Sequence, residues 1–197
     1  MELKAIEQTR KSGAEEIIGI NKSRSLLNFW QWAYSDLIGN TERGAVAEYL
    51  VALACDIEDR HRIGWDAYDL ELKNGIKIEV KSSAYLQSWK QGNYSKPIFS
   101  IRQTIAWDYF ENIYGTEKKR HADVYVFALL AHRDKDSLNP LDVKQWEFYV
   151  LASQVIELEL LEAKQVSLSR LEKLGAKKCK FEMLLECIQL AVFHPVQ

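Results

Sequence analysis

The N-terminal third of the chain carries two apolar patterns of helical period. Between residues 23 and 38 the apolar positions near one stripe are Leu26, Leu27, Trp30 and Tyr34. Between residues 41 and 55 a second stripe holds Val46, Leu50 and Leu53. Apolar residues three or four positions apart line one face of a helix. The pattern therefore predicts helices over 23–38 and 41–55, with Asn40 or Thr41 as the cap of the second helix.

Runs rich in β-branched and aromatic residues follow, and they predict strands. Residues 67–72 and 76–82 flank Lys73-Asn74-Gly75, which is a turn signal. Residues 122–131 form a nearly continuous apolar run, which is typical of a strand buried on both faces. Shorter runs predict a strand over 146–151, and a short strand or a binding edge over 98–101.

Helical pieces alternate with these strands. They are predicted over residues 104–113, 153–156 and 167–174. The pattern from residue 178 onward is ambiguous. The resulting order predicts an α/β fold, with a central mixed β-sheet flanked by helices.

The turn at residues 73–75 decides which residues of its two strands face each other. A two-residue Asn-Gly loop would pair every charged residue with an apolar one. A three-residue loop with Gly75 in the left-handed region instead gives the apolar pairs Leu72–Ile76, Leu70–Ile78 and Tyr68–Val80. Because the hydrophobic pattern sets the register wherever one face is buried, we expect the three-residue loop.

In this register the other face carries charged pairs. They are Glu71–Lys77, Asp69–Glu79 and Ala67–Lys81. Like charges directly opposite, as in Asp69 and Glu79, are destabilising unless a cation lies between them. Lys81 shares their face, because side chains alternate along a strand. Two facing carboxylates beside an ammonium group suit a divalent metal held against a phosphate.

Two other interpretations of the hairpin stay open. Charged residues that alternate with Ile and Val are also typical of a solvated sheet face, and Glu-x-Lys recurs elsewhere in the chain. Asp66 is a rival for Asp69. It has the opposite strand parity and would face Glu79 only if the strand contained a bulge.

Size and composition are those of a soluble globular protein with one domain. The chain has 197 residues, of which 47% are hydrophobic and 27% charged. It has no apolar run of about 18 residues, as a membrane helix would need. The N-terminus lacks an apolar signal core, which favours a cytoplasmic protein. Three sparse cysteines, Cys55, Cys179 and Cys187, favour reduced, buried thiols over a disulfide or zinc framework.

Charge is distributed unevenly. The formal net charge is −2, so the chain is not basic as a whole. Residues 73–102 nevertheless contain six basic residues, Lys90 among them, and one acid, Glu79, which gives a local charge of +5. A basic surface around a carboxylate pair can attract a polyanion, although lysines also serve simply to solubilise a surface.

The upstream acid, the turn and the strand of residues 78–83 resemble the active-site hairpin of the PD-(D/E)xK nuclease superfamily, which has the restriction endonuclease-like fold. The likeness spans roughly residues 42–130 and includes the preceding helix. It implies a Mg²⁺ (or Mn²⁺) ion bound by Asp69, Glu79, the Val80 carbonyl and Glu48, with Lys81 as a further catalytic residue that orients the attacking water. Glu48 could equally be an ordinary exposed helix acid.

The same resemblance implies a nucleic-acid contact after the lysine strand. Some branches of the superfamily have a glutamine there that reaches the active site or the scissile strand, and Gln87 looks similar. The candidate binding residues are Ser83, Tyr85, Gln87, Trp89 and Lys90. Tyr85 and Trp89 could stack on bases, although such aromatic residues are more often packing residues.

The favoured function is a metal-dependent endonuclease, with DNA as the preferred partner, no membrane association and a homodimer for duplex cleavage. We expect a single domain over 1–197, with a nuclease-like core at about 41–151. A helical N-terminal segment and a C-terminal extension would pack on that core. The alternatives are a catalytically silent nucleic-acid-binding or assembly module on the same fold and, third, an unrelated soluble enzyme.

Overall fold

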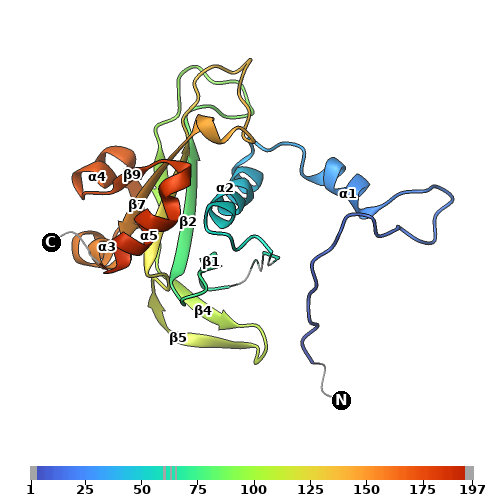
Figure 1. The fold of residues 1–197 in the computed structure, drawn as a ribbon, viewed down its shortest axis with the longest axis horizontal. Coiled ribbons are helices and arrows are strands. Elements are labelled where there is room, and N and C mark those ends of the chain that lie inside the picture. Colours follow the sequence, from blue (N-terminus) through green and yellow to red (C-terminus); the bar gives the residue numbers. More distant parts are fainter. Residues whose placement is uncertain (1–3, 60, 63, 65, 194–197) are drawn as a thin grey trace.

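A mixed β-sheet forms the centre of the molecule (Figure 1). The computed structural model describes residues 4–59, 61–62, 64 and 66–193. The sheet has the strand order β1-β2-β6-β7-β9. Its strands are β1 (Leu70–Glu71), β2 (Lys77–Ala84), β6 (Val124–Leu130), β7 (Trp146–Ala152) and β9 (Lys177–Cys179). β2 and β6 run parallel, and the other neighbours run antiparallel.

Helices cover both faces of this sheet. One face packs against α2 (Asn40–Ala54) and α5 (Leu184–Phe193). The other packs against α3 (Ser153–Leu160), α4 (Leu168–Lys173) and a small sheet of β3 (Ile98–Ser100) and β8 (Gln165–Ser167). Two short 3₁₀ turns, η1 (Val143–Gln145) and η2 (Phe181–Met183), directly precede β7 and α5. The predicted α/β class with a mixed central sheet is confirmed.

β6 shows why the sheet holds two cores. All seven of its residues are buried, as its apolar run predicted. Val124 and Val126 point into the cluster beneath α2 and α5, whereas Tyr125 and Phe127 point into the cluster beneath α3 and α4. Since side chains alternate along a strand, one apolar run supplies both layers.

The predicted register of the first hairpin is confirmed. Leu70 lies opposite Ile78. The Leu72 N–H donates to the Ile76 carbonyl at 2.9 Å, and Gly75 has a φ of +87°. β1 is shorter than the predicted strand over 67–72, because the Asp69 side chain replaces a backbone hydrogen-bond partner before β1 begins. Its Oδ2 accepts from the Val80 N–H at 2.7 Å, where a paired strand would otherwise offer a backbone carbonyl.

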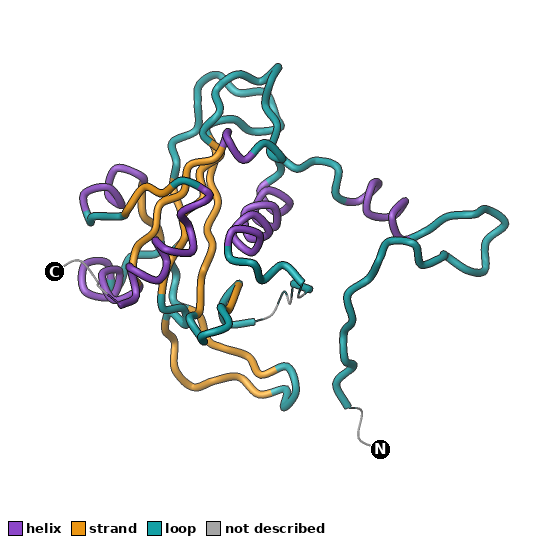
Figure 2. The backbone as a smooth tube through the Cα atoms, viewed as in Figure 1, coloured by secondary structure: helices purple, strands orange, loops and turns teal. Residues whose placement is uncertain are grey.

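The helix predicted over residues 104–113 is wrong. The segment instead begins a separate antiparallel hairpin of β4 (Thr104–Asp108) and β5 (Ile113–Lys119), which stands apart from the main sheet (Figure 2). Its apolar residues are mainly aromatic and β-branched, and these favour strands. Asn112 closes the turn with a φ of +53°, a region that asparagine tolerates well.

The N-terminal segment extends away from the sheet (Figure 1). α1 (Leu26–Ala33) is shorter than the predicted helix over 23–38 and has no buried residue. The packing of this segment on the core therefore stays a prediction, and α1 itself contributes no buried side chain to it. Across the described residues, no helix is long and apolar enough to cross a membrane.

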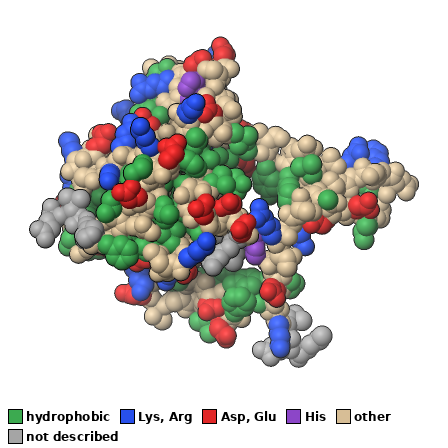
Figure 3. All heavy atoms as spheres, in the orientation of Figure 1, with side chains coloured by type: hydrophobic (Ala, Val, Ile, Leu, Met, Phe, Trp, Pro, Cys, Tyr) green, Lys and Arg blue, Asp and Glu red, His purple; other side chains and the backbone are tan. Residues whose placement is uncertain are grey.

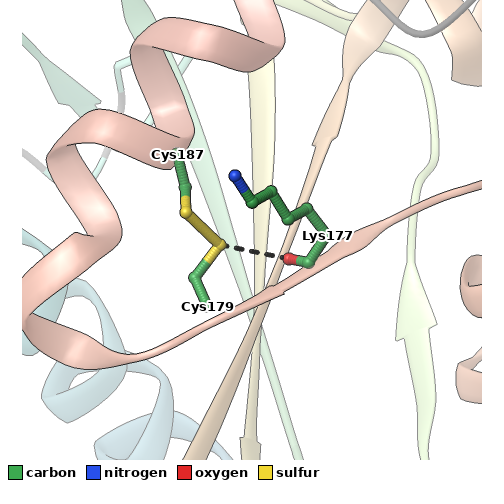
Figure 4. Close-up of a disulfide and its surroundings, with 3 residues drawn as sticks. All are labelled: Lys177, Cys179 and Cys187. Atoms are coloured by element: carbon green, nitrogen blue, oxygen red, sulfur yellow. Dashed lines mark hydrogen bonds between the residues drawn. A yellow bond between two sulfur atoms is a disulfide. The ribbon is translucent and has the colours of Figure 1, made fainter.

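The C-terminal segment packs on the core and contains a disulfide. Cys179 of β9 and Cys187 of α5 are bonded, and the Cys179 Sγ lies 3.2 Å from the Lys177 carbonyl oxygen (Figure 4). The expectation of reduced thiols is wrong for this pair. A strand and a helix eight residues apart have no spacing signature in the sequence, so only the fold reveals the pairing. Cys55 is a free, buried cysteine as predicted, and burial, with help from Asp56, raises the pKa of its thiol to about 12.

Candidate active site

Asp69, Glu79 and Lys81 come together at the edge of the sheet. β2 carries Glu79 and Lys81 on one face, and the turn brings Asp69 back beside them. The Lys81 ammonium forms an ion pair with Glu79, and its Nζ lies 3.8 Å from Asp69 Oδ2. The two carboxylates therefore share the Lys81 ammonium, on the face where the register argument placed all three side chains.

Asp69, rather than Asp66, completes this group. The β1–β2 register holds at Leu70 and Glu71, and Asp69 continues it, since its N–H donates to the Ile78 carbonyl at 3.1 Å. Within the described residues, the ion pairs of Lys81 are with Asp69 and Glu79. Burial and the charge of Glu71 raise the pKa of Asp66, which lines the neighbouring cavity instead.

The electrostatics of the group follow from partial burial and close charges. Burial and the neighbouring Asp69 raise the pKa of Glu79, although the Lys81 ammonium opposes them. Burial alone would lower the pKa of Lys81, but Asp69 and Glu79 outweigh it, and the Lys81 pKa is raised. Lys81 therefore stays protonated and serves as a hydrogen-bond donor.

Glu48 approaches the same edge from α2. It is buried, and it accepts two hydrogen bonds from Arg62, one from Nε and one from Nη2 at 3.0 Å. Burial raises the pKa of Glu48, the Arg62 hydrogen bond lowers it in part, and the charge of Asp69 raises it further. Glu48 is thus no ordinary exposed helix acid, but Arg62 occupies both of its oxygens.

A cavity of about 400 Å³ opens beside these residues. Its lining includes Glu48, Tyr49, His61, Arg62, Asp66 and Asp69. On the face shown in Figure 3, acidic and basic side chains gather beside the hollow between the main body and the N-terminal segment. The cavity gives a small charged molecule access to Asp69 from solvent.

The donors available to a metal ion are few. Across the part of the chain that the structure describes, no three His, Cys, Asp or Glu side chains gather closely enough to hold one. Asp69 and Glu79 offer carboxylate oxygens, and Val80 between Glu79 and Lys81 offers a backbone carbonyl. Mg²⁺ commonly uses only one or two protein carboxylates and completes its shell with water and phosphate oxygens. The donor set fits such an ion.

The predicted nucleic-acid contacts differ in burial. Ser83 lies on β2 on the same face as Glu79 and Lys81, and the other four follow β2. Ser83 is buried, and Gln87 is buried in a polar network in which its Oε1 accepts from Arg43 at 3.3 Å. The Tyr85 ring packs beneath the Arg133 guanidinium at 4.2 Å. Trp89 and Lys90 are exposed in the loop beyond β2. The loop therefore presents Trp89 and Lys90 to solvent, while Gln87 holds it in place.

Sequence reasoning missed two residues that shape the site. Arg62, the partner of Glu48, lies on an irregular segment with no pattern to place it. Tyr125 lies beside Glu79 on β6, and burial followed by the Glu79 charge raises its pKa. Tyr125 could have been found from sequence only if the β2–β6 pairing had been known.

A known protein family matches most of this chain. The model of the family described as bacteriophage T4 endonuclease IV matches residues 23–168, which is more than half of the chain. The match includes Glu48, Arg62, Asp69, Glu79 and Lys81. No match was found among curated proteins or among solved structures. The chain belongs to the bacteriophage T4 endonuclease IV family.

Proposed function

We propose that this protein is a metal-dependent nuclease that hydrolyses phosphodiester bonds in DNA. The observation that carries the proposal is the group of Asp69 and Glu79 around the Lys81 ammonium. Membership of a family named for an endonuclease supports it. DNA is preferred to RNA because the hairpin resembles the PD-(D/E)xK enzymes, and we propose the restriction endonuclease-like fold on the same ground.

In this proposal the carboxylates of Asp69 and Glu79, with the Val80 carbonyl, hold Mg²⁺ or Mn²⁺. The bound ion would polarise the scissile phosphate and lower the pKa of a coordinated water. Glu48 is available as a further oxygen donor only if Arg62 releases it.

Lys81 acts directly on the reacting groups. Its raised pKa keeps it protonated at neutral pH, so its ammonium donates to a phosphate oxygen and orients the attacking water. Asp69 and Glu79 hold this ammonium in position from two sides. Catalysis of this kind depends on positioning and on charges arranged in advance.

The test combines cleavage with metal binding. We expect the purified chain to cut DNA when Mg²⁺ or Mn²⁺ is added, and Glu79→Ala and Lys81→Met to lose at least about 100-fold of the rate. In titration calorimetry, wild type should bind Mn²⁺ and Asp69→Asn should not. The matched control is Glu159→Gln, since Glu159 is an exposed acid that pairs with Arg170 and forms no ion pair with Lys81. Cleavage that survives Glu79→Ala would contradict the site assignment.

A catalytically silent nucleic-acid-binding or assembly module is the second candidate. It is favoured by the ion pairs, because Lys81 already neutralises the facing carboxylates and Arg62 already holds Glu48. Such a module would bind nucleic acid with a strong salt dependence. It would show no heat of Mn²⁺ binding, and this separates it from the nuclease.

We also propose that duplex cleavage uses a homodimer, since one such site reaches one strand at a time. Sedimentation equilibrium with a duplex present should then give the mass of two chains plus one duplex. A single-chain mass together with cuts in both strands would contradict the dimer and leave the nuclease proposal intact.

A further inference from the structure

The β4–β5 hairpin is an arm with no role in the core. Every residue of β5 is exposed, and no residue of either strand belongs to the two buried clusters. In Figure 1 the arm projects from one end of the main sheet, on the side where β1 lies. Packing in the two cores therefore does not explain its aromatic residues.

The outer part of the arm is nevertheless rich in aromatic rings. Phe110 and Tyr114 are 78% and 71% exposed. Trp107 packs edge-to-face on Tyr109 with ring centroids 5.8 Å apart, and Tyr109 packs on Phe110 at 5.5 Å. The Tyr109 hydroxyl also donates to the Ile6 carbonyl at 3.0 Å, so Tyr109 is held in place. Phe110 and Tyr114 remain as the rings with the most surface to offer.

The base of the arm is cationic. Lys118 and Lys119 end β5, and exposed Arg102 precedes β4. Lys119 pairs with Glu117 at 3.0 Å, whereas neither Lys118 nor Arg102 has an ion pair among the described residues. Residues 104–119 also carry three acids, of which Asp108 and Glu111 flank Phe110, so the positive charge of the arm lies at its base and not beside the rings. The arm thus joins exposed rings at its outer part to Lys118 and Arg102 at its base, and the base complements the phosphates of a polyanion.

The base of the arm is also fixed close to the carboxylate group. The Asp123 N–H donates to the Lys77 carbonyl at 2.9 Å, and the Lys77 N–H donates to the Asp123 side chain at 2.8 Å. Lys77 begins the strand that carries Glu79 and Lys81, and four residues of strand span about 13 Å. Asp123 lies four residues beyond the end of β5, so this end of the sheet links the site to the base of the arm. A nucleic-acid chain that extended from the site past Lys77 would therefore run toward the arm.

We propose that the β4–β5 hairpin is a second nucleic-acid contact, in which Phe110 and Tyr114 pack against bases while Lys118 and Arg102 lie along the phosphates. This inference rests on the proposed function and names the surface that holds the substrate outside the active site. Exposed aromatic rings suit bases, because every base has a face on which a ring can stack.

The experiment measures DNA affinity apart from chemistry. Fluorescein-labelled DNA, both single-stranded and duplex, is titrated with the full chain in EDTA, and anisotropy is recorded. We expect Phe110→Ser and Tyr114→Ser each to weaken binding by about tenfold for at least one form of DNA. Phe110→Trp should keep the affinity, and Leu158→Ser, an exposed apolar residue on α3, is the matched control. Wild-type affinity in both serine variants would overturn the inference.

A small substrate separates this inference from the proposed function. The p-nitrophenyl ester of thymidine 5′-phosphate is a phosphodiester too short to touch the arm, so its Mg²⁺-dependent hydrolysis should be unchanged in both serine variants. If wild type hydrolyses neither this ester nor DNA, the nuclease proposal fails. The anisotropy titrations then still test whether the arm binds DNA. If the serine variants instead change the sedimentation mass and leave DNA affinity intact, the arm is an interface between copies and the inference is wrong.

Discussion

At the scale of single residues, Glu79 is a carboxylate that costs stability. Its pKa is raised by burial and by Asp69, so the Glu79 carboxyl is harder to ionise in the folded protein than in the unfolded chain. The contribution of Glu79 to the free energy of unfolding is therefore fully present below the pKa of the unfolded chain. It is lost as the pH rises through the higher pKa of the folded protein. We therefore expect the Glu79 carboxylate to be retained for the proposed function, although it lowers the stability of the fold.

Glu79→Gln tests this cost. Glutamine resembles the protonated acid, so the variant should be more stable than wild type at pH 7.5, and the difference should shrink toward pH 4. DNA cleavage should fall by at least about 100-fold. Urea unfolding at the two pH values gives the stabilities. A variant less stable at pH 7.5 would mean that the ion pair with Lys81 outweighs burial.

Arg62 and Glu48 form the second residue-scale case. Arg62→Ala leaves a buried carboxylate without its cation, which we expect to cost about 1–2 kcal/mol, because the half-exposed guanidinium is partly screened by solvent. Losing Arg62 raises the Glu48 pKa further, so the cost should be larger at pH 7.5 than at pH 5. Urea unfolding measures it.

A double-mutant cycle identifies the cause. Glu48→Gln removes the buried charge, so adding it to Arg62→Ala should recover most of the lost stability. If the double variant is as unstable as Arg62→Ala, the guanidinium stabilises the segment through contacts other than Glu48.

The positions of the candidate site residues were predictable where strand geometry determined them. Asp69, Glu79 and Lys81 followed from pairing apolar residues across a turn, which uses only local sequence. The contacts of Glu48 did not follow, because Arg62 reaches it from an irregular segment with no period. Gln87 looked like a contact, yet its amide is buried with Arg43, and burial of this kind depends on how the loop folds back.

At the scale of elements, Arg120 joins three segments. Its side chain is fully buried and donates to the backbone carbonyls of Ile101, Leu160, Leu161 and Ala163 at 2.8–3.2 Å. It also pairs with Glu157 of α3 at 3.0 Å. The base of the β4–β5 arm is thereby tied to the end of α3.

Arg120→Met should cost about 3–5 kcal/mol in urea unfolding, since it leaves Glu157 and several carbonyls without their donor. Arg120→Lys should recover less than half of the loss, because one ammonium lacks the planar fork of a guanidinium. The control is Arg170→Met, which breaks an exposed pair with Glu159 and should cost less than about 1 kcal/mol. Equal losses in the two methionine variants would contradict this role.

Gly75 is the element-scale test of the hairpin turn. Its φ of +87° disfavours any side chain, so Gly75→Ala should destabilise the protein by about 1 kcal/mol. Gly92 lies in open space without a left-handed φ, and Gly92→Ala should be neutral or slightly stabilising. Thermal denaturation of the pair compares them, and a neutral Gly75→Ala would argue against the three-residue loop.

Helices and strands were predictable where burial requires a clear apolar pattern in the sequence. β6 and β7 stood out because their apolar runs fill the two cores. The β4–β5 arm was misjudged as a helix, since an exposed hairpin has no buried face to impose a period of two. The Cys179–Cys187 disulfide was equally hidden, because it depends on α5 packing across β9.

At the scale of the whole molecule, the segment before residue 23 lies outside the family match and beside the core. Its described links to the body include an exposed ion pair of Arg10 with Asp59 at 3.5 Å and the hydrogen bond to Tyr109. Deleting it should change the free energy of unfolding by less than about 1 kcal/mol. Urea unfolding and DNA cleavage check this, and a loss above about 2 kcal/mol would make the segment part of the folding unit.

The sharing of one ammonium by two acids has a practical consequence for handling the molecule. Lys81 offsets the charge of Asp69 and Glu79 from within the chain. We therefore expect the protein to fold without a bound metal ion. A preparation kept in chelator should therefore stay native through storage. Under the proposed function, divalent metal ions would then be needed for cleavage and not for folding.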